Sequence, residues 1–293
     1  MSLFFVGVGS GLVTAAIIAL STVGMSLQYS VTRTINFAHG ELMTIGAYAA
    51  YVVARHTSNV LLQGAAAVAV GGALAWAFNR LLFRPFTRRG AGALTLFVLT
   101  IAASLIVQNV LEAIFSGNFV NYPSSASAAY RVGPFRWTLT DILTMAAAVV
   151  ALLALHFTIR RTKFGKAQRA VADDMTLART TGVRARQIVD LTWVIDGGVA
   201  GLSGMLLALQ VGSFTPSLGF TFLLVIFSAA IVGGIGQMYG AMAGALIVGV
   251  VMEVSAVYIP PDYKETMAFL ILIVVLLLRP QGIVAALSER TVR

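Results

Sequence analysis

The sequence predicts an all-α integral membrane protein, a bundle of about eight to nine transmembrane helices of which one is short or broken. Of its 293 residues, 58% are hydrophobic and 11% are charged, whereas soluble proteins average about 45–50% and about 25%. The apolar runs lack the period-2 alternation of membrane strands, which favours helices. Charged side chains are absent from residues 1–32, 57–79, 90–111, 142–159 and 197–252.

The apolar runs predict nine helices, and a helix needs about 20 apolar residues to cross a hydrocarbon core of about 30 Å. The run between Glu41 and Arg55 is too short for an upright span unless its ends snorkel or it forms a broken or re-entrant helix. The first run lacks the basic start and the cleavage site of a signal peptide, so we expect a retained span. The predicted helices cover residues 4–27, 41–54, 57–79, 90–111, 138–159, 191–209, 217–235, 240–258 and 264–278.

Two basic connections set the predicted topology. Residues 80–89 carry four arginines and no acid, and residues 160–186 carry eight basic side chains against Asp173 and Asp174. Both are therefore expected in the cytoplasm, with the tail that holds Arg279, Arg290 and Arg293. Residues 113–136 are predicted to form an outer loop. The N-terminus lies outside if the short helix crosses the membrane and inside if it does not.

Several chemistries have no support in the sequence. The net charge of +9 comes from the basic connections, so it reflects topology and not nucleic-acid binding. There is no GxxxxGK[ST] nucleotide loop, no HExxH metal motif and no cysteine. Gly201-Leu202-Ser203-Gly204 matches the GxSG of intramembrane serine proteases, but the last histidine is His156, before that motif. We therefore expect no enzyme, no metal site and no cofactor bound by this chain.

Ionisable residues inside spans are costly and are functional candidates. Asp196 is the deepest, although neighbouring hydroxyls or the cytoplasmic interface could also satisfy it; Glu112 and Glu253 lie near span ends. The polar stretch from Asn36 to Glu41 predicts a break beside the substrate path, with an ordinary cytoplasmic connector as the alternative. The candidates for the translocation path are Asn36, His39, Glu41, Gln108, Asn109, Asp196 and Gln210.

Glycines spaced by four predict close helix packing, because they lie on one helix face and let a neighbouring backbone approach. The two sets are Gly197 with Gly201, and Gly236 with Gly240 and Gly244. No soluble domain interrupts the spans, so residues 1–293 are expected to form a single transmembrane domain with a cytoplasmic loop at about 160–190.

That loop predicts a short amphipathic helix from Lys166 to Thr181. Small apolar residues alternate with charged ones, and Gly182 would end the helix as a C-cap. Such a helix suits docking onto another protein, and the alternative is a helix lying on anionic headgroups. The apolar residues are Ala167, Ala170, Val171, Met175 and Ala178.

With these motifs in view, the chain resembles the shorter permease subunit of bacterial branched-chain amino acid ABC transporters. The departures are minor: Gln237 stands where the family usually has serine, and Asp173 where glutamate or glutamine is common. The stretches that carry the resemblance are Ile35-Asn36-Phe37-Ala38-His39-Gly40-Glu41-Leu42, Gly46-Ala47-Tyr48, Arg84-Pro85, Gln108-Asn109, Gly165-Lys166-Ala167, Arg169 to Asp174, Ala178, Gly182-Val183, Val232 to Gly236, Tyr263-Lys264 and Arg279-Pro280-Gln281-Gly282.

The resemblance implies an ATP-driven importer in the bacterial cytoplasmic (inner) membrane. Its other parts would be a second related permease, two cytoplasmic ATPase subunits that bind ATP and Mg, and a periplasmic substrate-binding protein. The segment from Ala170 to Gly182, with Asp173, Asp174 and Ala178, would be the coupling helix that docks on the ATPases. The cargo stays open between branched-chain and other amino acids, amides, urea and aromatic acids.

The competing class is a stand-alone ion-coupled secondary transporter or channel for small polar solutes. It would need an intramembrane carboxylate such as Asp196 and would not need a docking helix.

Overall fold

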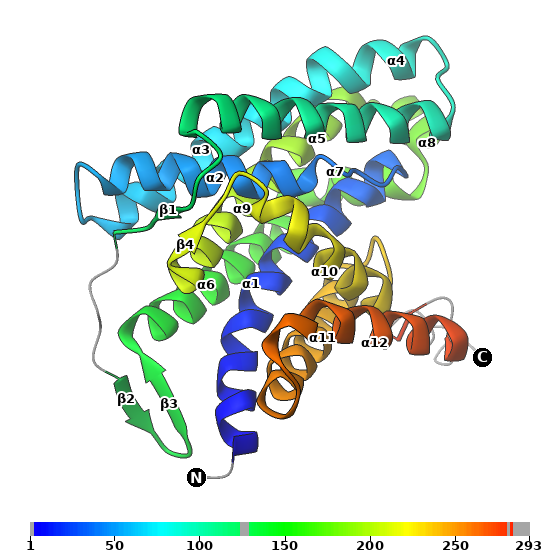
Figure 1. Cartoon of the computed structure of the whole chain (residues 1–293). Coiled ribbons are helices and arrows are strands. Elements are labelled where there is room, and N and C mark those ends of the chain that lie inside the picture. Colours follow the sequence, from blue (N-terminus) through cyan, green and yellow to red (C-terminus); the bar gives the residue numbers. More distant parts are fainter. Residues whose placement is uncertain (1–2, 124–128, 280–281, 284–293) are drawn as a thin grey trace. The chain divides into compact units, whose positions relative to one another are not determined.

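A computed structural model describes residues 3–123, 129–279 and 282–283, and this part of the chain is mostly helical (Figure 1). Six of the described helices are long and apolar enough to cross a membrane. They are α1 (Leu3–Thr32), α3 (Val60–Ala77) continued by η1 (Phe78–Phe83) and α4 (Arg84–Arg88), α5 (Ala93–Phe115), α6 (Leu139–Arg161), α9 (Ala185–Val211) and α11 (Met238–Tyr258).

The remaining helices of the described chain are shorter. Three of them match predicted segments, and the others lie in the connections. At about 1.5 Å per residue, a helix of 16 residues such as α2 is about 24 Å long, which is less than the hydrocarbon core of about 30 Å. The three that match predicted segments are α2 (His39–Ala54), α10 (Leu218–Gly233) and α12 (Lys264–Leu278). Those in the connections are α7 (Lys163–Asp173), α8 (Met175–Thr180) and the 3-10 turn η2 (Pro261–Tyr263).

Each predicted helix is present, and the differences lie at the ends. Helix α1 continues to Thr32, and α9 begins at Ala185, six residues before the predicted start at 191. Helix α10 is shorter than the full span predicted at 217–235 because the chain turns at Gly234 and Gly236, which have φ of 104° and 86°. Part of the predicted tail, Pro280, Gln281, Arg290 and Arg293, lies outside the described residues.

The chain divides into two compact units, each built from separate stretches of sequence. Unit 1 contains Met1–Ser26, Ser124–Val150 and Phe222–Arg293. Unit 2 contains Leu27–Pro123 and Ala151–Thr221.

In unit 1, glycines bring α11 against the first part of α1 and against α10. A Cβ added to Gly11 would lie 2.7 Å from the Val250 Cα, and one added to Gly244 would overlap the Ala229 carbonyl oxygen. Gly240 likewise lies against the Gly233 backbone. The close packing predicted for Gly240 and Gly244 is therefore present in the structure.

The structure corrects the placement of Gly236. This residue precedes α11, which begins at Met238, and its φ of 86° places it in the turn after α10. It does not share a helix face with Gly240 and Gly244, because the four-residue spacing crosses the helix start.

In unit 2, α2, α3 and α9 approach one another closely at five glycines. A Cβ on Gly46 would overlap the backbone of Gly201, and one on Gly71 would overlap the Gly197 carbonyl oxygen. Gly204 lies against the Met43 backbone in the same way. We call Gly46, Gly71, Gly197, Gly201 and Gly204 the glycine contact. The prediction from Gly197 and Gly201 is confirmed, and their partner glycines are on α2 and α3.

Short strands replace part of the predicted outer loop. In unit 2, β1 (Val120–Asn121) pairs antiparallel with β4 (Ser213–Phe214), and the buried Tyr122 hydroxyl donates to Gln63 Oε1 at 2.8 Å. Burial raises the pKa of the Tyr122 phenol above its usual value. In unit 1, β2 (Ala129–Val132) and β3 (Phe135–Thr138) form a hairpin. Residues 124–128 of this loop lie outside the described residues.

The glycine contact predicts that Gly201→Ala destabilises the protein. The new methyl group would overlap the Ala67 carbonyl oxygen, which cannot move without separating α3 from α9. We expect the free energy of unfolding to fall by about 3 kcal/mol, measured from the thermal midpoint in detergent.

Gly64→Ala is the matched control. It adds the same methyl group to α3, where the nearest atom is the Leu202 Cδ1 at 3.6 Å, an ordinary contact. Equal midpoints for the two variants would contradict the close approach of α3 and α9.

Candidate functional site

The chain leaves its helical path between α1 and α2. Helix α1 ends at Thr32, Arg33 has a positive φ of 54°, and α2 begins at His39. The break predicted at Asn36 to Glu41 is shifted in the structure: the non-helical residues are 33–38, and His39 and Glu41 lie in the first turn of α2. Asn36, His39 and Glu41 are each exposed by no more than 1%, so these side chains do not lie in bulk water as in an ordinary connector.

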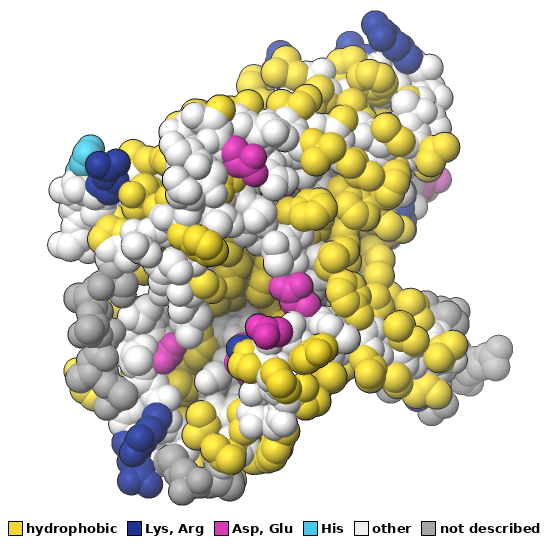
Figure 2. Space-filling view, viewed as in Figure 1, with side chains coloured by type: hydrophobic (Ala, Val, Ile, Leu, Met, Phe, Trp, Pro, Cys, Tyr) yellow, Lys and Arg dark blue, Asp and Glu magenta, His cyan; other side chains and the backbone are white. Residues whose placement is uncertain are grey.

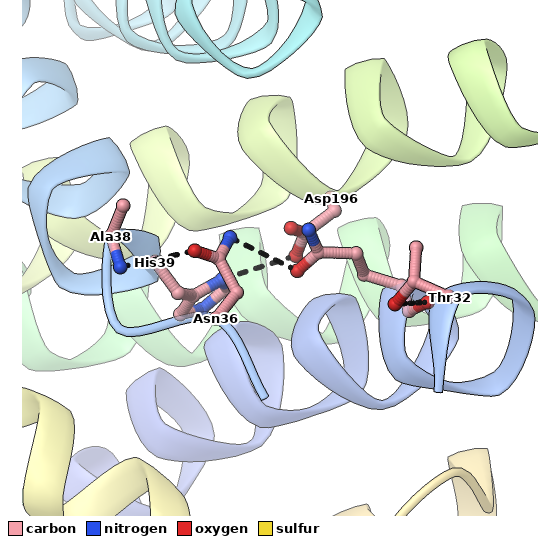
Figure 3. A network of polar contacts seen from close by, with 6 residues as sticks. Thr32, Asn36, Ala38, His39 and Asp196 are labelled. Carbon is pink, nitrogen blue, oxygen red and sulfur yellow. Dashed lines mark hydrogen bonds and ion pairs between the residues drawn. The ribbon is translucent and has the colours of Figure 1, made fainter. Parts of the chain in front are cut away.

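Asn36 stabilises this break with both ends of its side-chain amide (Figure 3). Its Oδ1 accepts from the Ala38 backbone N–H at 3.0 Å, and its Nδ2 donates to Gln28 Oε1 at 3.2 Å. The first bond closes a turn within the break, and the second ties the break to the last part of α1. Asn36 thus fixes the direction in which the chain enters α2.

His39 and Asp196 form the centre of the site. The His39 Nδ1 lies 3.3 Å from Asp196 Oδ1, and neither side chain is exposed (Figure 3). Asp196 directly precedes Gly197, so the glycine contact that brings α9 against α3 also holds this carboxylate inside the protein. The sequence analysis expected neighbouring hydroxyl groups or the cytoplasmic interface to satisfy Asp196. In the structure, the side chain beside Asp196 is His39.

A second buried carboxylate, Glu41, lies two residues after His39 in the first turn of α2. Glu41 Oε1 accepts from the Ser104 hydroxyl of α5 at 3.0 Å, and the Thr44 hydroxyl accepts from the Gly219 N–H at 3.0 Å. Glu41 Oε2 and both carboxylate oxygens of Asp196 are buried without a hydrogen-bond partner among the described residues. We call Gln28, Asn36, His39, Glu41, Thr44, Ser104 and Asp196 the buried polar cluster.

The other path candidates lie outside this cluster. Gln108 is half-buried on α5, where its Nε2 lies 3.4 Å from Glu112 Oε1, and Asn109 is exposed and bonded to the Leu105 carbonyl oxygen. Gln210 is exposed near the end of α9. The structure therefore separates the candidates into a buried group and an exposed group. Glu253, which is not among them, pairs with Lys264 Nζ at 2.8 Å in unit 1.

The predicted coupling helix is two helices in the structure. The single helix expected from Lys166 to Thr181 is interrupted at Asp174, which is the N-cap of α8. The Asp174 carboxylate accepts from the backbone N–H groups of Thr176 and Leu177 at 2.7 and 3.0 Å, so it ends α7 and starts α8. Gly182, with φ of 86°, ends α8 as predicted.

The small apolar face of this segment packs on the chain itself. Val171 and Ala178 are buried together with Val31 of α1 and Ala185 of α9, and Ala170 is partly buried against them. The opposite face is open: Asp173 and Asp174 are exposed, and the Leu177 side chain is 64% exposed. The surface available to a partner is therefore the acidic face with Leu177.

Polar contacts attach α7 to the neighbouring helix ends. Gln168 Nε2 donates to the Ser30 hydroxyl at 2.8 Å, and Arg33 Nη2 donates to the Ala172 carbonyl oxygen at 2.7 Å. Arg169 donates to the Ile159 carbonyl oxygen of α6 at 2.5 Å. A displacement of α7 would therefore pull on the break between α1 and α2, since Arg33 lies in it.

One polar group was not predicted from the sequence. Asn79 Nδ2 donates to Asp190 Oδ1 at 2.6 Å, and Arg84 Nη1 lies 3.8 Å from Asp190 Oδ2. The sequence feature that could have indicated this group is Asp190, a carboxylate at the start of a span that lies next to a connection rich in arginine.

Comparisons with known proteins identify the family of this chain. Residues 7–276 match the sequence profile of the family described as branched-chain amino acid transport system / permease component. The chain is 32% identical to the high-affinity branched-chain amino acid transport system permease protein LivH of Salmonella typhimurium, over 94% of this chain and 93% of that protein.

Two further relatives are more distant. The permease protein BraD of Pseudomonas aeruginosa is 31% identical over 94% of this chain and 93% of its own. The probable permease protein LivH of Methanocaldococcus jannaschii is 28% identical over 91% and 88%. No solved structure matches the chain.

The His39–Asp196 contact predicts coupled effects on stability. Removing either side chain leaves the other buried without its partner, so His39→Ala and Asp196→Ala should each lower the free energy of unfolding by about 3 kcal/mol. The double variant should lose about 1–3 kcal/mol less than the sum, measured by thermal unfolding in detergent.

Thr192→Ala combined with His39→Ala is the control pair. Thr192 is buried one turn before Asp196 and bonds to the Ile188 carbonyl oxygen of its own helix. Its effect should add to that of His39→Ala. If the His39 and Asp196 effects are also additive, the two side chains do not interact.

Proposed function

Because the chain belongs to the family of branched-chain amino acid transport permease components, we propose that it forms the translocation path of an ATP-driven importer for branched-chain amino acids. The observation that carries this proposal is the family match over residues 7–276, which covers almost all the described helices. The names of the relatives support the substrate class.

The chain is a non-catalytic subunit of the inner membrane and works with other ABC transporter components. We propose that these components are a second related permease, two cytoplasmic ATPase subunits that bind ATP and Mg, and a substrate-binding protein outside the membrane. Family membership disfavours the stand-alone secondary transporter. Intramembrane carboxylates such as Asp196 would then belong to a path that is driven by the partner subunits.

We propose eight to nine membrane segments with the N-terminus outside, both units forming one permease domain. Helix α1 is long enough to cross, and its last residues bond to α7, which the basic residues place in the cytoplasm. Helix α2 would be the short segment, entering the membrane from the cytoplasmic side after the break at residues 33–38. Helices α10 and α12 would complete the set as short apolar segments.

We propose that α7 and α8 transmit ATPase movement to the path. The exposed face with Asp173, Asp174 and Leu177 would dock on an ATPase subunit, while Ala170 and Ala178 would hold the segment to its own chain and Gly182 would end it. Support comes from the exposed carboxylates of Asp173 and Asp174 beside Leu177, because charged groups can orient and hold a partner of complementary charge. The bond from Arg33 to Ala172 would carry the movement to the break.

We propose that the buried polar cluster lines or gates the substrate path. Buried carboxylates inside a spanning protein are costly, so they are expected beside water or substrate. Asn36, His39, Glu41 and Asp196 would form the inner part. Gln108, Asn109 and Gln210, which lie on the surface of this subunit, would face the second permease.

Reconstitution tests the function. The complete complex in liposomes should take up leucine only when ATP is hydrolysed, since this chain has no nucleotide loop of its own. Isoleucine and valine should compete, whereas urea and benzoate should not. Uptake by this chain alone, driven by an ion gradient, would support the secondary transporter instead.

Changing the exposed face of the coupling segment should separate ATP hydrolysis from transport. Asp173→Lys reverses one charge and Asp174→Asn removes the other, and the asparagine oxygen can still cap α8. We expect uptake per ATP hydrolysed to fall at least about tenfold through lost complementarity with the ATPase. The measurement is uptake and phosphate release in the same liposomes.

Asp262→Lys provides the control for the charge change. Asp262 is also exposed, but it lies in η2 between α11 and α12, on the outer side in the proposed topology. This variant should transport normally. Normal coupling in the Asp173 and Asp174 double variant would rule out the docking face.

A further inference from the structure

A cavity of about 450 Å³ lies within unit 2, on the side that the basic residues place in the cytoplasm. It is enclosed by the end of α1, by η1 and α4, and by α5, α8 and α9. Figure 2 shows Lys and Arg side chains gathered at the end of the molecule where Figure 1 draws α4. Its polar wall includes Arg84, Arg88, Arg179, Arg186, Asn79 and Asp190. Its apolar wall includes Phe83, Leu96, Val189 and Trp193.

The wall carries a net positive charge, with four arginines against Asp190. Asp190 is already engaged by Asn79 and Arg84. In the part of the chain that the structure describes, no carboxylate lies within ion-pair distance of Arg88, Arg179 or Arg186. Three guanidinium groups are therefore left facing one cavity without an acidic partner.

A second cavity of about 620 Å³ extends this positive region. It shares Arg84, Arg179 and Arg186 with the first cavity, adds Arg184, and has no acid in its wall. Like charges brought together in this way repel one another, so the arrangement favours an anion between them.

We propose that the first cavity binds a phosphate group. Guanidinium groups bind phosphate oxygens in pairs of parallel hydrogen bonds, and basic pockets between spanning helices on the cytoplasmic side suit lipid headgroups. The rings of Phe83 and Trp193, tilted by 49° with their centroids 4.6 Å apart, give the cavity an apolar wall for the carbon atoms next to the phosphate. The phosphate belongs either to an anionic phospholipid of the inner leaflet or to a soluble phosphate compound.

The test measures binding by the assembled importer in lipid-free detergent, with phosphatidylglycerol and inorganic phosphate as separate probes and native mass spectrometry and thermal shift as readouts. The variant Arg88→Gln with Arg186→Gln removes two wall arginines whose guanidinium groups have no acidic partner among the described residues. This double variant should weaken the affinity for whichever probe binds by roughly tenfold or more, since each arginine near an anionic lipid raises the affinity about fivefold.

The control is Arg89→Gln with Arg161→Gln, which removes two exposed arginines of the same side that do not line the cavity. It should leave binding unchanged. Binding of phosphatidylglycerol alone identifies a lipid, and binding of inorganic phosphate identifies a soluble compound. Equal weakening in both double variants, or no binding of either probe, would overturn the proposal. The readouts do not depend on transport, so this result is independent of the proposed function.

Discussion

The close approach of α2, α3 and α9 is the constraint on which unit 2 depends. Side chains larger than hydrogen cannot fit where Gly46 meets Gly201 and where Gly71 meets Gly197. In lipid there is little hydrophobic force between helices, so close backbone packing must supply much of the stability. The same contact places Asp196 beside His39 and Gly204 beside the start of α2. A buried pair of polar side chains thus exists because the glycines bring their helices together.

The basic connections extend this arrangement outward. The N-cap at Asp174 divides the coupling segment, and its buried face joins it to the ends of α1 and α9. The hydrogen bond from Arg33 then links α7 to the non-helical residues that precede His39. A continuous set of packed groups therefore runs from the exposed acidic face to the buried polar cluster, which fits the coupling role proposed above.

The sequence predicted the helices well because long charge-free runs can only be stable in lipid as helices. It also predicted the break before α2, because Asn36, His39 and Glu41 are too polar for lipid. The pairing of His39 with Asp196 and of β1 with β4 could not be predicted, since both depend on contacts between distant parts of the chain. The helical composition around Asp174 concealed the interruption there, and Gly236 fitted a spacing that a turn interrupts.

Cysteine labelling tests the central claim, that the buried polar cluster lies beside the substrate path, most directly. The chain has no native cysteine, so Ser104→Cys reports on the cluster and Ile106→Cys, 63% exposed on the same helix, reports on the apolar surface. In the assembled importer, a membrane-impermeant thiol reagent should label position 104 in either the resting or the ATP-trapped state, and position 106 in neither. If position 104 is never labelled while residues elsewhere are, the path does not pass the cluster.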